Sequence, residues 1–456
     1  MTELKQGFLW GNSTSSMQTE GAFDEGGKGQ SVYDLRPATA EASDWKVAID
    51  DYHRYPEDIA LMKDLGMNCY RFQISWSRVN PTGDGEFNEE GIKFYSDLID
   101  QLLAAGITPM ICLYHFDMPL HLAEAYNGFA SDHVVEAFIR FGKEMVKRFA
   151  DRVPYWITFN EQNLYSVPEA FKISGYDGPK TPRALYQIQQ HVMTCHAAIA
   201  NEIHAHYPQI QIGGMLAYQE VYPHSPLPED VAATRKFLEF ADTNLIRLFT
   251  VGQYSTEVLH YIHREGWDDL LDPEEMAIIS QCTSDFLSFS YYSTATLDST
   301  KIPVATCPNF WGVLGHTPNP YLQTNEWQWQ IDPLGFRTVL TTIYNETHVP
   351  VFPIENGIGV REHWDGEHEI NDDYRIRYHR AHIQAMKDAV TLDGVECIGY
   401  LGWGLIDILS SAGNMDKRYG LVYVNRTNHD LMDLKRVPKR SFHWFKQVIA
   451  SNGEQL

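Results

Sequence analysis

Short apolar segments alternate with amphipathic ones along nearly the whole chain, and this alternation limits the fold more than any other feature. Most of the apolar segments are nearly continuous in aliphatic and aromatic side chains, which is typical of parallel strands buried on both faces. Eight strands are expected, at Phe8–Asn12, Cys69–Ser75, Met110–Tyr114, Tyr155–Phe159, Ile210–Leu216, Phe286–Ser290, Val351–Ile354 and Cys397–Leu401.

Helix signals occupy the intervals between these strands. Pro56 stands at an expected first helical position, and Gly66 is expected to end that helix. Asn88 and Ser131 are the expected N-caps of two further helices, and Thr181, followed by a proline, begins a longer one. Eight strand–helix units predict a protein of the α/β class with a (β/α)8 TIM barrel.

The chain is expected to form a single barrel domain, residues 1–456. Length alone favours two or three domains, but single α/β barrels also reach this size. No internal repeat or convincing linker divides the chain. One long irregular stretch, Ser293–Asp332, holds four prolines and three tryptophans. Loops of this length in a compact domain are usually functional, so we expect it to overhang the carboxyl ends of the strands.

The formal net charge of −24 argues against a broad surface for nucleic acid or an anionic membrane. An anionic ligand would need a local cationic pocket. Neither a signal peptide nor a membrane-spanning segment is expected from the apolar pattern. The six dispersed cysteines form no CxxC pair, which favours reduced structural thiols. These features together predict a cytoplasmic protein; whether it forms a homo-oligomer is left open.

Polar and aromatic side chains follow the apolar segments at seven of the eight expected strand ends. In a barrel, the carboxyl ends of the strands face the active site. We therefore expect these side chains to converge at one site. They are Gln18, Glu20, Arg71, His115, Asn160, Glu161, Tyr291, Tyr292, Glu355, Asn356 and Trp403.

Glu161 and Glu355, at the fourth and seventh strand ends, suit the hydrolysis of a glycosidic bond. One carboxyl group can protonate the leaving oxygen while the other attacks or stabilises the oxocarbenium-like carbon. Each glutamate stands beside an asparagine that could bind a sugar hydroxyl. A lone glutamate at a strand end is more often a rim ion pair, so the prediction rests on the pair.

Five motifs resemble those of glycoside hydrolase family 1, the retaining β-glycosidases, and they occur in the expected order. The resemblance extends from about Phe8 to Trp444. The motifs are Gln18-Thr19-Glu20-Gly21, Arg71-Phe72-Gln73-Ile74-Ser75-Trp76-Ser77-Arg78, Leu113-Tyr114-His115-Phe116-Asp117, Thr158-Phe159-Asn160-Glu161 and Ile354-Glu355-Asn356-Gly357.

The resemblance implies that Glu161 is the acid/base and Glu355 the nucleophile. Arg71 and Tyr292 would keep Glu355 ionised, and the negative charge of Glu355 would raise the pKa of Glu161. The carboxyl oxygens are expected about 5–5.5 Å apart, the separation of retaining enzymes. The resemblance also implies a set of substrate contacts. Gln18, His115 and Asn160 would bind sugar hydroxyls, Trp403 would floor the sugar ring, and Trp329 would line the leaving-group side.

The eighth strand end departs from ordinary β-glucosidases of this family, which carry a glutamate where this chain has Ser410. Ser410, Lys417 and Tyr419 resemble the phosphate-binding set of the phospho-β-glycosidase branch. A carboxylate near 4 Å from a phosphate would cost about 4 kcal/mol at an effective dielectric of about 20. Serine removes that charge, and the lysine and tyrosine supply donors. Ser290, in place of an asparagine, also fits this branch.

A phosphorylated small-molecule glycoside is thus the expected partner. Ser411 is small where phospho-β-galactosidases tend to have tryptophan, which favours 6-phospho-β-glucosides. A 6-phospho-β-galactosidase or an enzyme of dual specificity remains the alternative. A non-catalytic sugar-phosphate binding protein is the rival from another class. The nineteen histidines show no metal-ligand spacing, so no metal and no cofactor are expected.

Overall fold

The computed structural model describes residues 4–456 and contains all eight predicted strands, each bound lying within two residues of its expected position. The agreement follows from the apolar runs, because almost every strand position is buried. The strands are β1 (Leu9–Ser13), β2 (Cys69–Gln73), β3 (Thr108–Tyr114), β4 (Tyr155–Phe159), β5 (Gln211–Ala217), β7 (Phe286–Tyr291), β12 (Val351–Asn356) and β13 (Gly399–Trp403).

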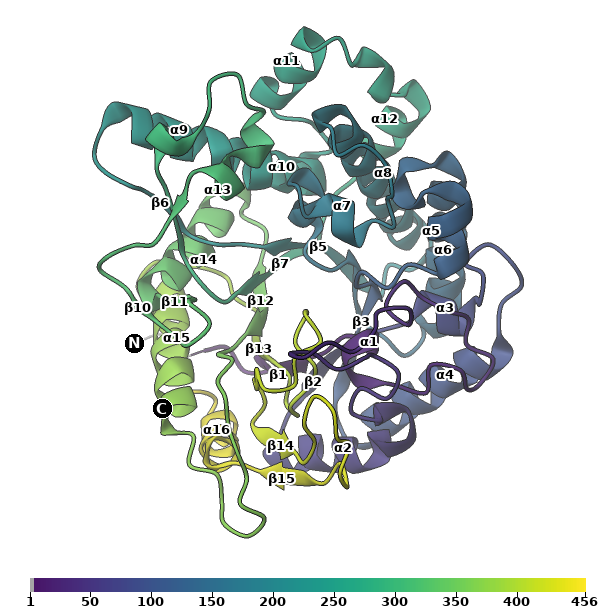
Figure 1. Ribbon diagram of the computed structural model, residues 1–456, viewed down its shortest axis with the longest axis vertical. Helices are drawn as coiled ribbons and strands as arrows, with labels where there is room; N and C mark the ends of the chain where they lie inside the picture. Colours follow the sequence, from purple (N-terminus) through teal and green to yellow (C-terminus); the bar gives the residue numbers. More distant parts are fainter. Residues whose placement is uncertain (1–3) are drawn as a thin grey trace.

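These strands form one parallel sheet in the order β12-β7-β5-β4-β3-β2-β1-β13. The two ends of the sheet meet at a parallel bridge between Val351 and Cys397. The backbone N–H of Ile398 donates to the carbonyl of Val351 there, at 3.1 Å. The sheet therefore closes on itself, and the predicted (β/α)8 barrel is confirmed (Figure 1).

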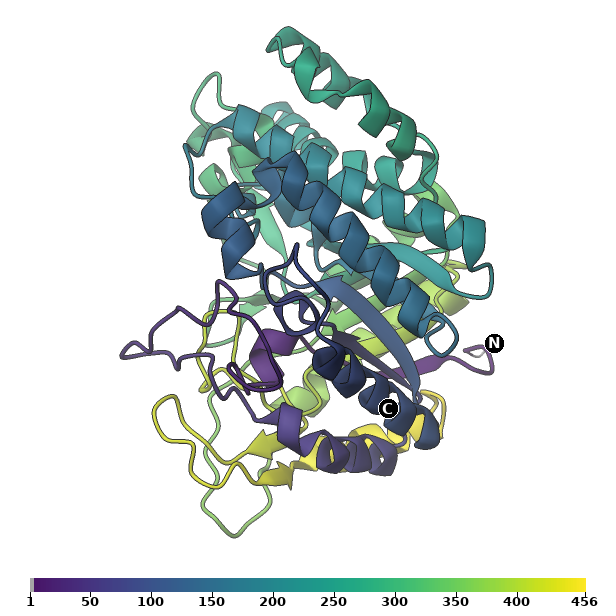
Figure 2. The same cartoon turned by 90° about the vertical axis from the view of Figure 1, so that its right-hand side faces the viewer.

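Helices surround the barrel, as Figures 1 and 2 show from two directions. The first seven link consecutive barrel strands and the last follows β13. They are α2 (Asp51–Leu65), α4 (Glu89–Ala104), α6 (Asp132–Phe149), α8 (Pro182–His206), α10 (Asn244–Val251), α14 (Pro333–Thr347), α15 (Asp373–Thr391) and α16 (Arg440–Ala450).

The predicted helix starts are confirmed at three of four places. The side chains of Asn88 and Thr181 accept hydrogen bonds from the first turns of α4 and α8. Ser131 occupies the N-cap of α6 without such a bond. The prediction for Pro56 is wrong, because α2 begins five residues earlier, at Asp51. Its tertiary packing outweighs the lost N–H donor. Gly66 ends α2 in the left-handed conformation, as expected.

A small cluster made only of strand residues fills the barrel interior. Phe352 and Ile354 of β12 both belong to it. The pairing of β12 with β7 then shifts register between Pro353 and Glu355. The carbonyl of Ile354 accepts a hydrogen bond from Ser13 of β1. This bulge lies immediately before the carboxyl end of the strand.

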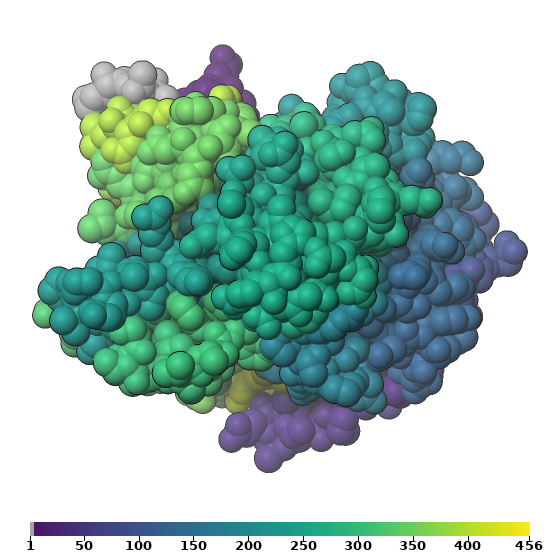
Figure 3. All heavy atoms as spheres, turned by 90° about the horizontal axis from the view of Figure 1, so that it is seen from above, coloured from purple at the N-terminus to yellow at the C-terminus, as the bar shows by residue number. Residues whose placement is uncertain are grey.

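The segment Ser293–Asp332, expected to be irregular, contains several short elements. They are β8 (Ala295–Leu297), α13 (Trp311–Leu314), β9 (His316–Thr317), β10 (Gln323–Thr324) and β11 (Gln330–Ile331). A further layer outside the barrel, α11 (Thr256–Arg264) and α12 (Pro273–Ile279), forms much of the teal-green surface in Figure 3. No helix within residues 4–456 combines the length and apolar character needed to cross a membrane.

Candidate active site

Glu355 projects from the carboxyl end of β12 into a polar cluster at the barrel mouth. Arg71, from β2, donates from Nη1 to Oε1 of Glu355 at 2.6 Å. Tyr292, directly after β7, donates its hydroxyl to Oε2 at 2.8 Å. Both carboxylate oxygens are thus engaged by donors from two different strands. The sequence-based placement of Arg71 and Tyr292 beside Glu355 is confirmed.

Two opposing effects act on the pKa of Glu355. Burial raises it above its ordinary value, because the charged form loses water. The Arg71 guanidinium and the Tyr292 hydroxyl oppose this shift by stabilising the carboxylate. Arg71 is fully buried and its pKa is raised, with nearby negative groups including Glu355 favouring its charged form. This arrangement suits a carboxylate that must be ionised to react.

Glu161 follows the end of β4 in a left-handed backbone conformation, with φ of 47°. Non-glycine residues seldom adopt this conformation, which concentrates at functional sites. Its Oε1 accepts a hydrogen bond from the hydroxyl of Ser290 on β7. Removal from water raises the pKa of Glu161 to about 8, and the charge of Glu355 adds to the shift. The sequence argument assigned the shift to Glu355; desolvation is in fact the larger cause.

Asn160 and His115 place unpaired polar atoms near the two glutamates. Oδ1 of Asn160 accepts from Nη2 of Arg71 at 2.6 Å. Within residues 4–456, Nδ2 of Asn160 and Nδ1 of His115 are buried without a hydrogen-bond partner. Burial, followed by the charge of Arg71, holds the pKa of His115 well below its usual range, so the ring is neutral. Buried unpaired groups at a strand end are ready to bind a polar ligand.

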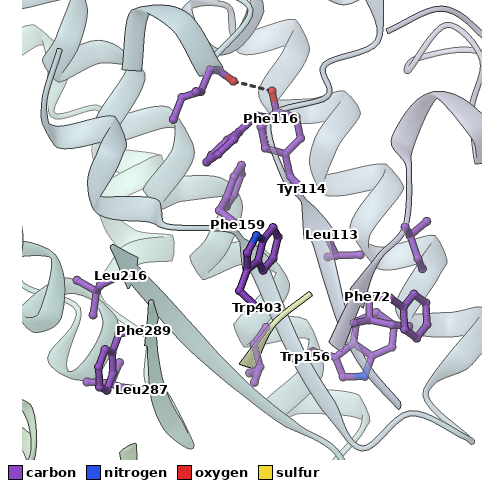
Figure 4. Close-up of a cluster of buried hydrophobic side chains, with 14 of the residues drawn as sticks. Phe72, Leu113, Tyr114, Phe116, Trp156, Phe159, Leu216, Leu287, Phe289 and Trp403 are labelled. Atoms are coloured by element: carbon purple, nitrogen blue, oxygen red, sulfur yellow. Dashed lines mark hydrogen bonds between the residues drawn. The ribbon is translucent and has the colours of Figure 1, made fainter. Parts of the chain in front are cut away.

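Trp403, the last residue of β13, lies beside this group. Its ring centroid is 5.7 Å from that of His115, and its side chain is 6% exposed. Trp403 belongs to the buried hydrophobic cluster drawn in Figure 4. The aromatic face and the unpaired histidine thus come from β13 and from the end of β3.

Gln18 is already bonded to the protein at both ends of its amide. Its Nε2 donates to the carbonyl of Leu409 at 2.6 Å, and its Oε1 accepts from the hydroxyl of Ser15 at 2.5 Å. The bond to Leu409 ties the end of β1 to the segment that carries Ser410. Gln18 therefore lies where it was expected, with remaining acceptor capacity on Oε1.

Ser410, Lys417 and Tyr419 follow the eighth strand, and the ammonium of Lys417 lies 5.5 Å from the Tyr419 ring centroid. Ser410 is buried, and its hydroxyl accepts from the N–H of Asn414 at 3.1 Å, which leaves its proton to donate. The Tyr419 ring centroid is 6.2 Å from that of Tyr292. Removal from water lowers the pKa of Lys417 to about 8. Among residues 4–456, no carboxylate forms an ion pair with this ammonium, which lies against the Trp329 ring.

Trp329 connects the long segment after β7 to the rest of the site. Its ring centroid lies 5.5 Å from that of Tyr292, and the Nζ of Lys417 lies 3.4 Å from the Trp329 ring centroid. The side chain is partly exposed. Trp329 thus lies close to both Tyr292 and Lys417.

The family assignment rests on the whole chain. A model of glycosyl hydrolase family 1 matches residues 1–454. The chain belongs to this family. It is therefore a glycoside hydrolase.

Family 1 relatives match over nearly their full length. The chain is 36% identical to the aryl-phospho-beta-D-glucosidase BglC of Bacillus subtilis, with 98% of each chain covered. It is 36% identical to a phospho-cellobiase of Klebsiella oxytoca, with 100% of each chain covered. A solved family 1 b-glucosidase from Thermotoga maritima superposes with a TM-score of 0.87 at 29% identity, covering 99% of both chains.

Not every polar residue of the family motifs joins the site. Asn356 was expected to bind a sugar hydroxyl, but its amide is used inside the barrel wall, where it bonds the Tyr291 carbonyl and the hydroxyls of Tyr378 and Tyr400. Glu20, also expected at the mouth, pairs with Arg78 at 2.8 Å instead. The hydroxyl of Tyr291 turns to Thr294 and Asp332.

Arg418 stands between two of the expected phosphate-binding residues of this family 1 chain but faces the opposite way. It is buried, pairs with Asp407 at 3.2 Å and donates to the carbonyls of Val424 and Arg426. Within residues 4–456, no group of three or more His, Cys, Asp or Glu side chains is positioned to hold a metal ion.

Ser290 is the contact that sequence reasoning missed. It was noted only as a departure from the family pattern, yet its hydroxyl touches Glu161 directly. Position 290 falls on the inward face of β7 with Phe286 and Ser288, as the two-residue period of a strand dictates. This two-residue period is the sequence signal that could have predicted an inward-facing Ser290.

Proposed function

We propose that the protein hydrolyses 6-phospho-β-D-glucosides with retention of anomeric configuration, releasing glucose 6-phosphate and an aglycone. Phosphorylated disaccharides such as cellobiose 6'-phosphate and aryl β-glucoside 6-phosphates are the expected substrates. The observation that carries the proposal is the buried side chain of Lys417, which has no carboxylate partner among residues 4–456 and lies in the segment where Ser410 replaces an acid. Relatives named phospho-beta-glucosidases and phospho-cellobiase support it.

In the first step, Glu355 attacks the anomeric carbon as its bond to the leaving oxygen breaks. Arg71 and Tyr292 hold the carboxylate charged and oriented until it reacts. Glu161, protonated because its pKa is about 8, gives its proton to the leaving oxygen. The products are a glycosyl ester on Glu355 and the free aglycone.

In the second step, water hydrolyses that ester. Esterification removes the charge of Glu355, so the repulsion that raises the pKa of Glu161 disappears. Glu161 then takes a proton from water, and the hydroxide attacks the same carbon from the face that the aglycone left. Asn160, His115 and Gln18 bind the sugar hydroxyls, Trp403 packs on the ring, and Trp329 lines the aglycone side.

Ser410, Lys417 and Tyr419 bind the 6-phosphate. The direct test compares nitrophenyl β-D-glucoside with its 6-phosphate, using the unchanged protein and Lys417→Ala. The substitution is expected to lower kcat/KM for the phosphorylated substrate by about 10- to 100-fold and to affect the other substrate little. A wild-type preference for the unphosphorylated sugar would contradict the proposal.

Retention is tested by proton NMR of the first anomer released. The β-anomer is expected, because two displacements at one carbon restore its configuration. Release of α-glucose 6-phosphate would exclude the double displacement. Glu355→Gln should abolish turnover; if it does not, the nucleophile is another group.

A 6-phospho-β-galactosidase or dual enzyme is the second candidate. The nitrophenyl 6-phosphogalactoside, measured beside the gluco form, decides between them. Faster hydrolysis of the galacto substrate would assign that specificity instead.

A further inference from the structure

Three aromatic rings surround the ammonium of Lys417. Its Nζ lies 3.4 Å from the centroid of Trp329, 5.3 Å from that of Trp327 and 5.5 Å from that of Tyr419. Cations are attracted to the faces of such rings at distances up to about 6 Å, and most strongly to tryptophan. The positive charge is therefore held by aromatic rings, with no ion pair to any of residues 4–456.

Gly359 supports the aliphatic part of the same side chain. A Cβ atom on Gly359 would lie 2.7 Å from Cγ and 2.9 Å from Cε of Lys417, and 3.2 Å from Cζ of Tyr419. The φ angle of Gly359 lies outside the left-handed region, so the backbone does not itself require glycine. The missing side chain instead makes room for the lysine stem.

A neighbouring asparagine holds the backbone of both tryptophans, and Trp327 also contacts the segment after β12. Oδ1 of Asn325 accepts from the backbone N–H groups of Trp327 and Trp329, at 2.9 and 3.0 Å. Arg361, in the segment after β12, places its guanidinium 4.3 Å from the Trp327 centroid and forms an ion pair with Glu326 at 2.8 Å. The segments after β7, β12 and β13 thus meet around Lys417.

This environment differs from a salt bridge in its effect on an incoming anion. A carboxylate beside Lys417 would neutralise the ammonium and repel a phosphate dianion. Aromatic faces orient the ammonium without an anion that neutralises it, so the N–H donors that point away from the rings remain available for a phosphate. Such pre-organisation reduces the cost of binding.

We propose that Trp327, Trp329 and Gly359 are positioning residues that hold Lys417 for the substrate 6-phosphate and thereby set the preference for phosphorylated sugars. The proposal rests on the function proposed above. It adds that preference depends on residues that carry no charge and lie outside the Ser410–Tyr419 segment.

Gly359→Ala tests this with the least disturbance, because the backbone tolerates alanine and the charge is unchanged. The readout is the ratio of kcat/KM for nitrophenyl β-D-glucoside 6-phosphate to that for nitrophenyl β-D-glucoside. We expect the ratio to fall about 10-fold, through a higher KM for the phosphorylated substrate. Gly357→Ala is the matched comparison, since a Cβ there meets only ordinary contacts at 3.7 Å or more, and its ratio should not change.

The double variant Gly359→Ala/Lys417→Ala separates positioning from general damage. If Gly359 acts through Lys417, its substitution should have no further effect on the ratio once the lysine is absent. A fall that persists in the Lys417→Ala background, or an unchanged ratio in Gly359→Ala alone, would overturn the positioning role. Failure of the proposed function itself would show differently, as a wild-type ratio below one.

Trp327→Leu is a second test, and it leaves Trp329, which lines the aglycone side, unchanged. It should lower the same ratio, again through KM. Because both substrates carry the same nitrophenyl group, effects on aglycone binding cancel in the ratio. An unchanged ratio in this variant would remove Trp327 from the set.

Discussion

The hydroxyl of Ser290 donates a hydrogen bond to Oε1 of Glu161 across the ends of two barrel strands. A donor to a carboxylate stabilises the charged form, so this bond lowers the pKa of Glu161 against the effect of burial. Burial and the charge of Glu355 raise the pKa of Glu161, the proposed acid/base, and the hydrogen bond from Ser290 lowers it.

Removing this hydroxyl should raise the pKa of Glu161. In Ser290→Ala the alkaline limb of the kcat/KM profile is expected to move to higher pH, because Glu161 keeps its proton longer. Ser288→Ala is the control, since that hydroxyl lies on the same strand but donates to the carbonyl of Gly214. A limb that stays in place, or moves to lower pH, would show that Ser290 does not tune the acid.

The alkaline limb itself should lie near pH 8. Glu161 must be protonated to assist departure of the aglycone, and its pKa is about 8, so kcat/KM falls as pH rises through that value. Lys417 also loses its charge near pH 8. The unphosphorylated substrate isolates Glu161, because Lys417 makes no contact with a phosphate there. A profile for that substrate that is flat to pH 10 would contradict the assignment.

Ser410→Glu should reverse the substrate preference. A carboxylate near 4 Å from the 6-phosphate costs about 4 kcal/mol, which lowers kcat/KM for the phosphorylated substrate by about 1000-fold. The unphosphorylated substrate should be retained or improved, because the glutamate can accept from sugar hydroxyls. Ala412→Glu, at an exposed position two residues away, carries the same charge and should change the ratio far less. Equal effects of the two variants would show that the added negative charge repels the phosphate from a distance and that position 410 has no special role.

Asp407→Ala should destabilise the fold more than it alters the chemistry. Asp407 is fully buried and pairs with Arg418 and Lys439, and its Oδ1 accepts from the N–H of Gly420. Asp407→Ala removes the carboxylate partner of the buried Arg418, whereas Lys439 keeps its ion pair with Glu362. Removing one partner of a buried pair costs about 3–5 kcal/mol in the free energy of unfolding. Chemical denaturation measures that loss. A change below about 1 kcal/mol, the typical value for an exposed pair, would show that the network is not structural.

The barrel and the positions of Glu161 and Glu355 at its strand ends could be predicted because both leave local signals. Continuous apolar runs identify buried strands, and polar residues that follow them, such as Glu161 and Arg71, identify the mouth. Pro56 misled because a single residue's preference is weaker than the packing of a whole helix.

Other features depend on contacts between distant segments and leave no local pattern. Asn356 follows Glu355 in the sequence, as a residue that binds a sugar hydroxyl could. Three hydrogen bonds inside the barrel wall use its amide instead. Two of the three rings around Lys417, those of Trp327 and Trp329, come from the segment after β7, about 90 residues away in the chain. Only the folded chain brings these partners together.

The bulge in β12 shows that the direction of a side chain does not follow from the residue type alone. Phe352 and Ile354 face the barrel interior, so a regular strand would turn Asn356 inward next and point Glu355 toward the helices. Glu355 reaches Arg71 because β12 carries one extra residue at this point. A strand of the same sequence paired in regular register would keep every one of these side chains and still aim the carboxylate toward the helices. At this position the enzyme depends on the register of the strand as much as on the chemistry of its residues.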